Sequence, residues 1–438
     1  MTQRRKMNRR TLLVVLLGLL TARHAAAQPA AKPQAAQAPR FTVDPLWPKP
    51  LPNHWILGSV VGVAVDKRDH VFVLNIPDYF NQRTEIGSAT TPVTGECCTP
   101  APPVLEFDPE GGLVANWGGP GSGYAWPTTP SGISIDNNGD VWIAGSGGRD
   151  TRILKFKRDG SFLAQFGQAG PAPAPAAPAA VDTAYTGVGG RGAAGRGGRG
   201  GGRGGRGAGP PPLPPSSSSM DSFGGATRIS FDDAGKEAYV ADGARNRRVA
   251  VIDMNTGSIK RFWGAYGNKP DDAGLPSYVP DASPAKQFGN PVQCAGLSKD
   301  GQVYVCDRAN DRIQVLRKDG TFVKEKTIAP RTLGDGSVWD VAFSPDAQQK
   351  FLYVADGMNM RVYVLERASL EVLTSFGDGG RQPGQFYGVH SIATDSKGNI
   401  YTGETYEGKR LQKFLFKGIA PVTRANTGVV WPAAGARP

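Results

Sequence analysis

The chain has 438 residues, more than one small domain needs, and a formal net charge of +12. Most of this charge lies in two segments. Residues 1–27 contain six basic side chains and no acidic one, and residues 171–220 contain five arginines and one aspartate. The rest of the chain is nearly neutral, which disfavours a nucleic acid or another acidic polymer as a partner.

The first 27 residues have the pattern of a secretory signal peptide. A basic start precedes the apolar stretch 12–20, and three alanines at 25–27 precede Gln28. Arg9 and Arg10 also fit a twin-arginine address, so the export route stays open. We therefore expect a periplasmic or secreted protein with no membrane span after cleavage. Residues 28–40, rich in Ala, Pro and Gln, are predicted to be a disordered tether.

After the tether the chain repeats one pattern: an apolar run, a short turn, a second apolar run that ends near Asp, and an Arg that opens a third run. The clearest copies cover residues 238–249, 303–313 and 352–362. Aligning the copies on their turns gives six units of four short strands. The pattern predicts an all-β fold, a six-bladed β-propeller with four-stranded antiparallel blades.

Three insertions interrupt the predicted propeller, which spans residues 41–418. Two are loops, at 77–103 and 268–284. The largest, 171–220, contains Ala/Pro, Arg-Gly-Gly and Pro/Ser stretches and is predicted to be disordered. The sixth unit lacks a fourth strand, and we expect residues 41–47 to pair as that outer strand. Residues 419–438 are predicted to be a C-terminal tail.

The four cysteines fall into two pairs. Cys294 and Cys306 lie on two apolar runs joined by a hairpin turn, so a cross-strand disulfide between them is predicted. Cys97 and Cys98 are adjacent in a Pro/Thr-rich loop, where either a vicinal disulfide or two thiols fit the sequence. Neither spacing is that of a zinc knuckle.

Residues 303–316 and 352–365, together with the inner strand 388–395, resemble NHL repeats, and residues 41–417 as a whole resemble a six-bladed NHL-type propeller. Within that group the chain looks most like the peptidyl-α-hydroxyglycine α-amidating lyase propellers. That resemblance implies three channel histidines holding zinc. Only His390 matches such a position, Gln293 stands where a second histidine is expected, and Arg308 is a lyase-like feature that is retained. The implied zinc site is incomplete.

Residues that open the inner strands of a propeller form a ring around its central channel. By the turn alignment this ring is Val61, Ser131, Thr227, Gln293, Trp339 and His390. With the residues that follow them and nearby loops, they give our candidates for binding a ligand at the channel mouth: Thr227, Arg228, Gln293, Arg308, Trp339, Asp340, Tyr387 and His390. The recurrent pairs Asp307 with Arg312 and Asp356 with Arg361 are interpreted as scaffold, because they repeat between blades.

Two functions fit these patterns. The first is an exported, monomeric propeller that binds a peptide, a protein or a small polar ligand through its unequal loops. The alternative is a metal-dependent lyase or hydrolase, resembling the amidating lyases through His390 or the sugar lactonase propellers through Asp340 and Arg228. The cofactor is left open, since calcium or zinc in the channel is compatible with the sequence.

Overall fold

The computed structural model describes residues 35–77, 84, 85, 87, 92, 94, 96, 98–170 and 211–422. Contacts divide the chain into residues 1–35 and residues 36–438, and the strands of the described residues all belong to the second unit. The predicted signal peptide, residues 171–210 of the predicted insertion, Cys97 and residues 423–438 lie outside the described residues. Among the described residues, no helix has the length and apolar character needed to cross a bilayer.

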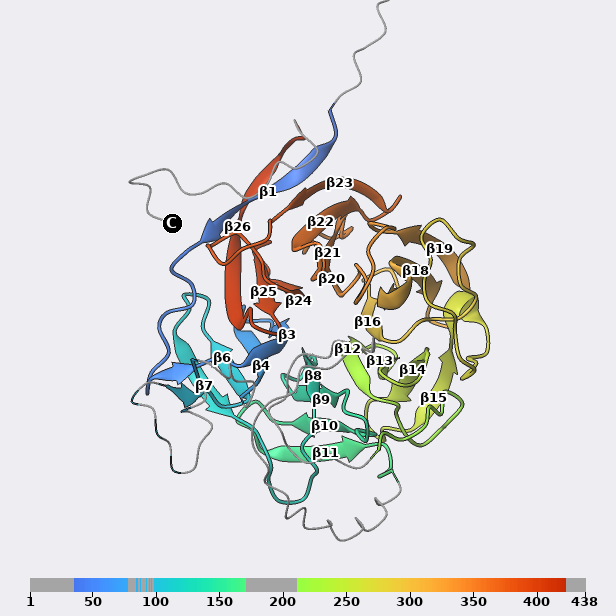
Figure 1. Ribbon diagram of the computed structural model, residues 1–438, viewed down its shortest axis with the longest axis horizontal. Coiled ribbons are helices and arrows are strands. Elements are labelled where there is room, and N and C mark those ends of the chain that lie inside the picture. Colours follow the sequence, from blue (N-terminus) through green and yellow to red (C-terminus); the bar gives the residue numbers. More distant parts are fainter. Residues whose placement is uncertain are drawn as a thin grey trace, which may run out of the picture. The chain divides into compact units, whose positions relative to one another are not determined.

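Six four-stranded antiparallel sheets are arranged as the blades of a propeller, which confirms the predicted fold class (Figure 1). The first three blades are β3 (Ser59–Val65), β4 (Val71–Ile76), β6 (Val104–Phe107) and β7 (Leu113–Trp117); β8 (Pro130–Ile135), β9 (Val141–Gly145), β10 (Ile153–Phe156) and β11 (Phe162–Phe166); and β12 (Ala226–Asp232), β13 (Glu237–Asp242), β14 (Arg248–Asp253) and β15 (Ile259–Trp263).

The last three blades are β16 (Val292–Leu297), β17 (Gln302–Asp307), β18 (Arg312–Arg317) and β19 (Phe322–Thr327); β20 (Asp340–Phe343), β21 (Phe351–Asp356), β22 (Arg361–Glu366) and β23 (Glu371–Phe376); and β24 (Val389–Thr394), β25 (Ile400–Glu404), β26 (Arg410–Pro421) and β1 (Gln37–Asp44). The short strands β2 (Trp55–Ile56) and β5 (Thr99–Pro100) form a parallel pair, and η2 (Ala265–Gly267) and η3 (Arg308–Asn310) are single 3-10 turns.

The two ends of the described chain close the ring. Strand β1 pairs antiparallel with β26 and becomes the outer strand of the sixth blade, as predicted. Its start corrects the predicted boundary of the tether, because residues 37–40 are already strand, and β26 continues into the predicted tail as far as Pro421. Because the first and last strands of the described chain pair in one sheet, the sixth blade ties the two ends of the propeller together.

The apolar core is divided among the gaps between neighbouring blades. Each of six buried clusters in the described residues draws mainly on two adjacent sheets; for example, Trp142 of β9 packs with Ala238 and Val240 of β13. One buried aromatic recurs near the start of each second strand. It is the second residue on β4, β9 and β25 (Phe72, Trp142 and Tyr401) and the third on β13, β17 and β21 (Tyr239, Tyr304 and Tyr353). Each such side chain contributes roughly 1.5–3 kcal/mol by burial.

The strand directions define two faces. The loops that enter the inner strands, and those that join the second and third strands, lie on one face, which we call the mouth face. The turns between the first two strands lie on the opposite turn face, where Asp66, Asp136 and Asp395 each accept two backbone N–H bonds of their own turn.

Buried arginines fasten the mouth-face loops to the blades. Arg248, fully buried, pairs with Asp242 and donates to the carbonyl oxygens of Ser217, Ser219 and Ser222. Residues 211–220, predicted to belong to the disordered insertion, are therefore held against the third blade. The prediction missed this because it judged the segment by composition alone.

The same arrangement recurs in two other blades. Arg312 pairs with Asp307, as predicted, and donates to the carbonyl oxygen of Gln287 at 3.2 Å. Arg410 pairs with Glu404 and donates to the carbonyl oxygen of Gln385 at 2.7 Å.

The fifth blade departs from the pattern. Asp356 and Arg361 face each other across β21 and β22. Asp356, however, accepts from Asn359, and Arg361 donates to Ser375 at 3.4 Å. Asp356 also accepts the backbone N–H groups of Met358 and Asn359, so it holds its own turn as expected of a scaffold residue, without an ion pair to Arg361.

Candidate functional site

The six residues predicted to open the inner strands line one central cavity. Val61, Ser131, Thr227, Gln293, Trp339 and His390 all contribute, together with Arg228, Asp340 and Ser391. The cavity measures about 10 Å³, room for about one water molecule. Their convergence is a structural fact, whereas a role in binding a ligand stays a prediction.

Bulges in the inner strands aim most of these side chains into the channel. Val61, Ser131, Gln293 and His390 are each the extra residue at a register shift between an inner strand and its neighbour, and in the third blade the shift spans Thr227 and Arg228. Trp339 directly precedes β20, and its N–H donates to the carbonyl oxygen of Ala355, the residue paired with Asp340. A bulge turns one side chain out of the regular alternation, which explains why ring residues from different blades meet.

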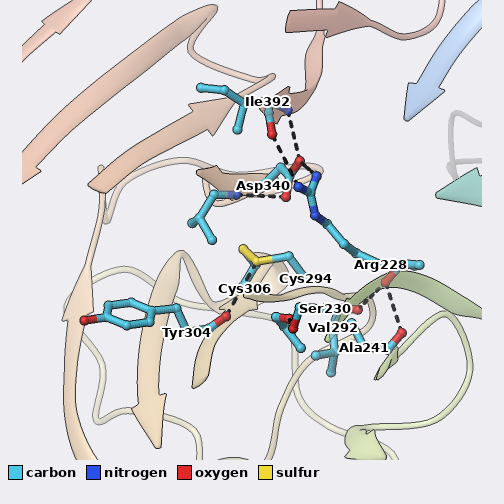
Figure 2. The surroundings of a disulfide bond; sticks show 12 residues. Arg228, Ser230, Ala241, Val292, Cys294, Tyr304, Cys306, Asp340 and Ile392 are labelled. Atoms are coloured by element: carbon cyan, nitrogen blue, oxygen red, sulfur yellow. Dashed lines mark hydrogen bonds and ion pairs between the residues drawn. A yellow bond between two sulfur atoms is a disulfide. The ribbon is translucent and has the colours of Figure 1, made fainter. Parts of the chain in front are cut away.

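An ion pair crosses the channel beneath the ring. Figure 2 shows Arg228 of the third blade reaching toward Asp340 of the fifth and the backbone of Ile392 in the sixth. Asp340 is buried and also accepts the N–H groups of Ile392 and Val341, at 3.0 and 2.9 Å. Burial raises the pKa of Asp340 and the charge of Arg228 opposes that rise. The pair therefore links the third and fifth blades across the channel.

Arg308 lies above the ring on the mouth face. Its guanidinium carbon sits 4.1 Å from the ring centroid of Trp339, a cation–π contact. Nε donates to the carbonyl oxygen of Asp335 at 2.6 Å, and one terminal nitrogen donates to Gln293 Oε1 at 3.2 Å. Its other terminal nitrogen lies 3.5 Å from Asp335 Oδ2, and only 11% of the Arg308 side chain is exposed.

His390 stands between these groups. Its ring meets Trp339 edge to face, with centroids 5.6 Å apart, and its Nε2 lies 3.5 Å from Gln293 Nε2. Burial, and then the positive charges of Arg308 and Arg228, lower the pKa of His390 to about 3. The imidazole is therefore neutral throughout the physiological range. Its Nδ1 is buried, and a hydrogen bond with the backbone of Val61 partly opposes the lowering of the His390 pKa.

Two residues of this cluster, Tyr406 and Asp335, were not predicted from the sequence. Tyr406, in the loop after β25, donates to Asp335 Oδ2 at 2.8 Å, and its ring centroid lies 6.2 Å from that of Trp339. Asp335 precedes Gly336, where a Cβ would lie 1.9 Å from the carbonyl oxygen of Arg308 and φ is +75°. The Gly334-Asp-Gly336 sequence signals such a tight loop, but not its contact with a different blade.

A disulfide joins Cys294 and Cys306, which face each other across β16 and β17 with a Cα separation of 4.8 Å. Gln293 precedes one cysteine, and Arg308 follows the other by two residues. The cross-link therefore connects the two strand ends that carry the Arg308–Gln293 hydrogen bond. Cys97 lies outside the described part of the chain, so the choice between a vicinal disulfide and two thiols at Cys97 and Cys98 stays a prediction.

Tyr387 lies apart from the central cavity. Its side chain is exposed, its backbone N–H donates to Glu404 at 2.8 Å, and the guanidinium carbon of Arg381 sits 4.5 Å from its ring centroid. It belongs to the rim of the mouth face rather than to the ring.

The residues around His390 do not fit a zinc or calcium site. Among the described residues, no group of three or more His, Cys, Asp or Glu side chains gathers to hold a metal. The nearest charged neighbours of His390 include two arginines, which repel a cation, and Asp340 is engaged by one of them. No step of a metal-dependent reaction is derived for this site.

No protein-family model and no curated protein matches this chain. Solved structures do match: a chain of the mitotic checkpoint complex at 10% identity, covering 93% of this chain and 99% of that one, with a TM-score of 0.42. Virginiamycin B lyase from Staphylococcus aureus matches at 11% identity, 83% and 87% coverage and a TM-score of 0.41. A protein of unknown function from Bacteroides thetaiotaomicron matches at 12% identity, 88% and 77% coverage and a TM-score of 0.43. At these values the likenesses carry no inference about function.

Proposed function

We propose that this protein is an exported NHL-type propeller that acts as a binding scaffold, taking a peptide, a protein or a small polar ligand at its mouth face. The signal-peptide pattern of residues 1–27 supports export, and the repeated strand sequences support the NHL type.

One observation carries the proposal. Side chains from three blades converge around the central cavity: Arg308 stacked on Trp339, Gln293, and neutral His390. Polar and aromatic groups that are already held by contacts within the protein can orient a ligand without first being ordered themselves.

The rim around this cluster supplies apolar contact area. Leu333, Met358, Tyr387 and Tyr406 are exposed on mouth-face loops, with Leu333 60% accessible. A Cβ at Gly334 would touch Met358 at 3.2 Å, so the loops of the fourth and fifth blades adjoin here. Tyrosine and arginine are enriched among the interface residues that carry most of the binding free energy. The metal-dependent lyase or hydrolase, by contrast, is favoured by no observation at the ring.

A peptide library displayed on phage tests the proposal. We expect recovered peptides, resynthesised and measured by calorimetry, to lose at least about tenfold in affinity on Arg308→Gln and on Tyr387→Ala. The matched control is Arg317→Gln, an exposed arginine on the turn face, which should leave affinity unchanged. Equal binding to the wild type and both mouth variants would refute a site at the mouth.

A further inference from the structure

The loop of residues 328–337, which joins β19 to β20 on the mouth face, is held at both ends by Asp311. The N–H of Ile328 donates to the Asp311 carbonyl oxygen at 2.8 Å, and the N–H of Ser337 donates to its Oδ1 at 2.8 Å. A Cβ added at Gly336 would lie 3.3 Å from the same Oδ1. The loop therefore packs directly on the Asp311 carboxyl and contributes to its complete burial.

The same loop positions groups at the mouth. Arg308 Nε donates to the carbonyl oxygen of Asp335 at 2.6 Å, and the Tyr406 hydroxyl donates to Asp335 Oδ2 at 2.8 Å. Leu333, also in the loop, is one of the exposed apolar side chains of the rim. A change in the conformation of residues 328–337 would therefore alter both the polar cluster and the rim.

The hydrogen bonds beneath the loop favour a protonated Asp311. The Ser337 hydroxyl lies beside the Asp311 carboxyl, and it donates to the carbonyl oxygen of Ile328 at 2.5 Å. A hydroxyl has one proton, so toward Asp311 the Ser337 oxygen can only accept. A neutral Asp311 can donate to that oxygen, whereas an ionised Asp311 opposes it with a second acceptor.

The titratable groups around Asp311 are acids from four elements: Asp307 of β17, Asp356 of β21, Tyr363 of β22 and Tyr278 of the 268–284 loop. The adjacent cation, Arg312, is paired with Asp307 at 2.7 Å. Burial and the two neighbouring carboxylates therefore oppose the ionised form of Asp311, and they raise its pKa to about 7.

We propose that Asp311 is a pH-sensitive switch of the mouth face: its protonated carboxyl holds the loop of residues 328–337 closed, and its ionisation favours an open loop. Linkage gives the direction. A carboxyl that ionises more readily when water reaches it must, once ionised, favour the conformation that admits water. Opening then removes the contacts of Asp335 with Arg308 and Tyr406. The inference goes beyond the proposed function, because it concerns the loop whatever the mouth binds.

Hydrogen–deuterium exchange of the whole protein, followed by mass spectrometry, tests the switch without any ligand. Protection factors, which correct for the pH dependence of intrinsic exchange, are compared at pH 5.5 and pH 8 for peptides that contain Ile328 and Ser337. We expect the wild type to lose at least about tenfold in protection there at pH 8. Peptides that cover the Asp136 turn of the second blade should keep their protection.

The variant Asp311→Asn supplies the comparison. Its amide oxygen still accepts from the Ser337 N–H, its amide nitrogen can donate as a protonated carboxyl does, and it cannot ionise, so protection of the loop should be equal at both pH values. Asp281→Asn removes the exposed carboxylate that pairs with Arg331 of the same loop, and it should keep the wild-type pH dependence.

Equal protection of the wild-type loop at both pH values, or the same pH dependence in Asp311→Asn, overturns the inference. A pH-dependent loop in a protein that binds no peptide at its mouth would support the switch and refute the scaffold. Peptide binding by a protein whose loop ignores pH would refute the switch alone.

Discussion

Asp311 is expected to make the stability of the propeller depend on pH. It follows η3 on the mouth face, is fully buried, and has a left-handed backbone with φ of +51°. Its Oδ1 accepts the N–H of Ser337 at 2.8 Å, while its Oδ2 has no hydrogen-bond partner. Burial, and to a smaller degree the carboxylates of Asp356 and Asp307, raise the pKa of Asp311 to about 7.

The size and sign of the effect follow from linkage. A rise from 3.8 to about 7 means that the native state binds the proton more tightly than the unfolded chain does. The contribution of this proton to the free energy of unfolding is fully present below pH 4. It is lost as the pH rises toward 7, by at most about 4 kcal/mol. Asn at position 311 keeps an acceptor for Ser337, tolerates the left-handed conformation and carries no titrating proton.

Urea unfolding of the wild type and Asp311→Asn at pH 4.5 and pH 8 measures this difference. We expect Asp311→Asn to gain stability relative to the wild type at the higher pH. The control Asp281→Asn removes one side of an exposed ion pair, and its free-energy difference from the wild type should be the same at both pH values. If the free-energy difference between Asp311→Asn and the wild type is the same at both pH values, Asp311 does not titrate in this range.

Two further stability predictions concern the fastenings of the blades. Arg248→Met should cost about 3–5 kcal/mol, because it leaves Asp242 buried without its partner, whereas the exposed Arg317→Met should change the urea midpoint little. Replacing Cys294 and Cys306 with alanine should cost about 3 kcal/mol, the value for a loop closed over a separation of 12 residues. An unchanged unfolding midpoint, either in this double variant or in reduced wild type, would contradict that estimate.

The sequence predicts the blades and the ring positions well because both depend on local spacing. Each ring residue stands five positions before the residue that begins the first turn of its blade: Asp66, Asp136, Asp232, Ser298, Ser344 and Asp395. This fixed count survives even in the first two blades, where the repeat is loosest. The buried tyrosines of the second strands do not keep a fixed count from the ring, but they lie in the apolar run that follows each first turn, where the repeat places them.

Contacts between blades are harder to anticipate. Tyr406 and Asp335 meet across 71 residues of sequence, and Arg228 reaches Asp340 across 112. Ring closure brings such residues together, and no local pattern specifies which loop side chains then touch. The prediction of disorder for residues 211–220 was wrong for a related reason. Arg248, on a strand of the third blade, holds this segment by hydrogen bonds that its own composition does not indicate.

The bulges at the ring place single residues of the inner strands outside the strand pairing. Gln293 and His390 are skipped in the register that pairs each inner strand with its neighbour. Their side chains therefore take no part in the strand pairing that holds each blade together. A substitution at one of these positions can change the chemistry of the channel lining while the hydrogen-bond register of the sheets stays the same.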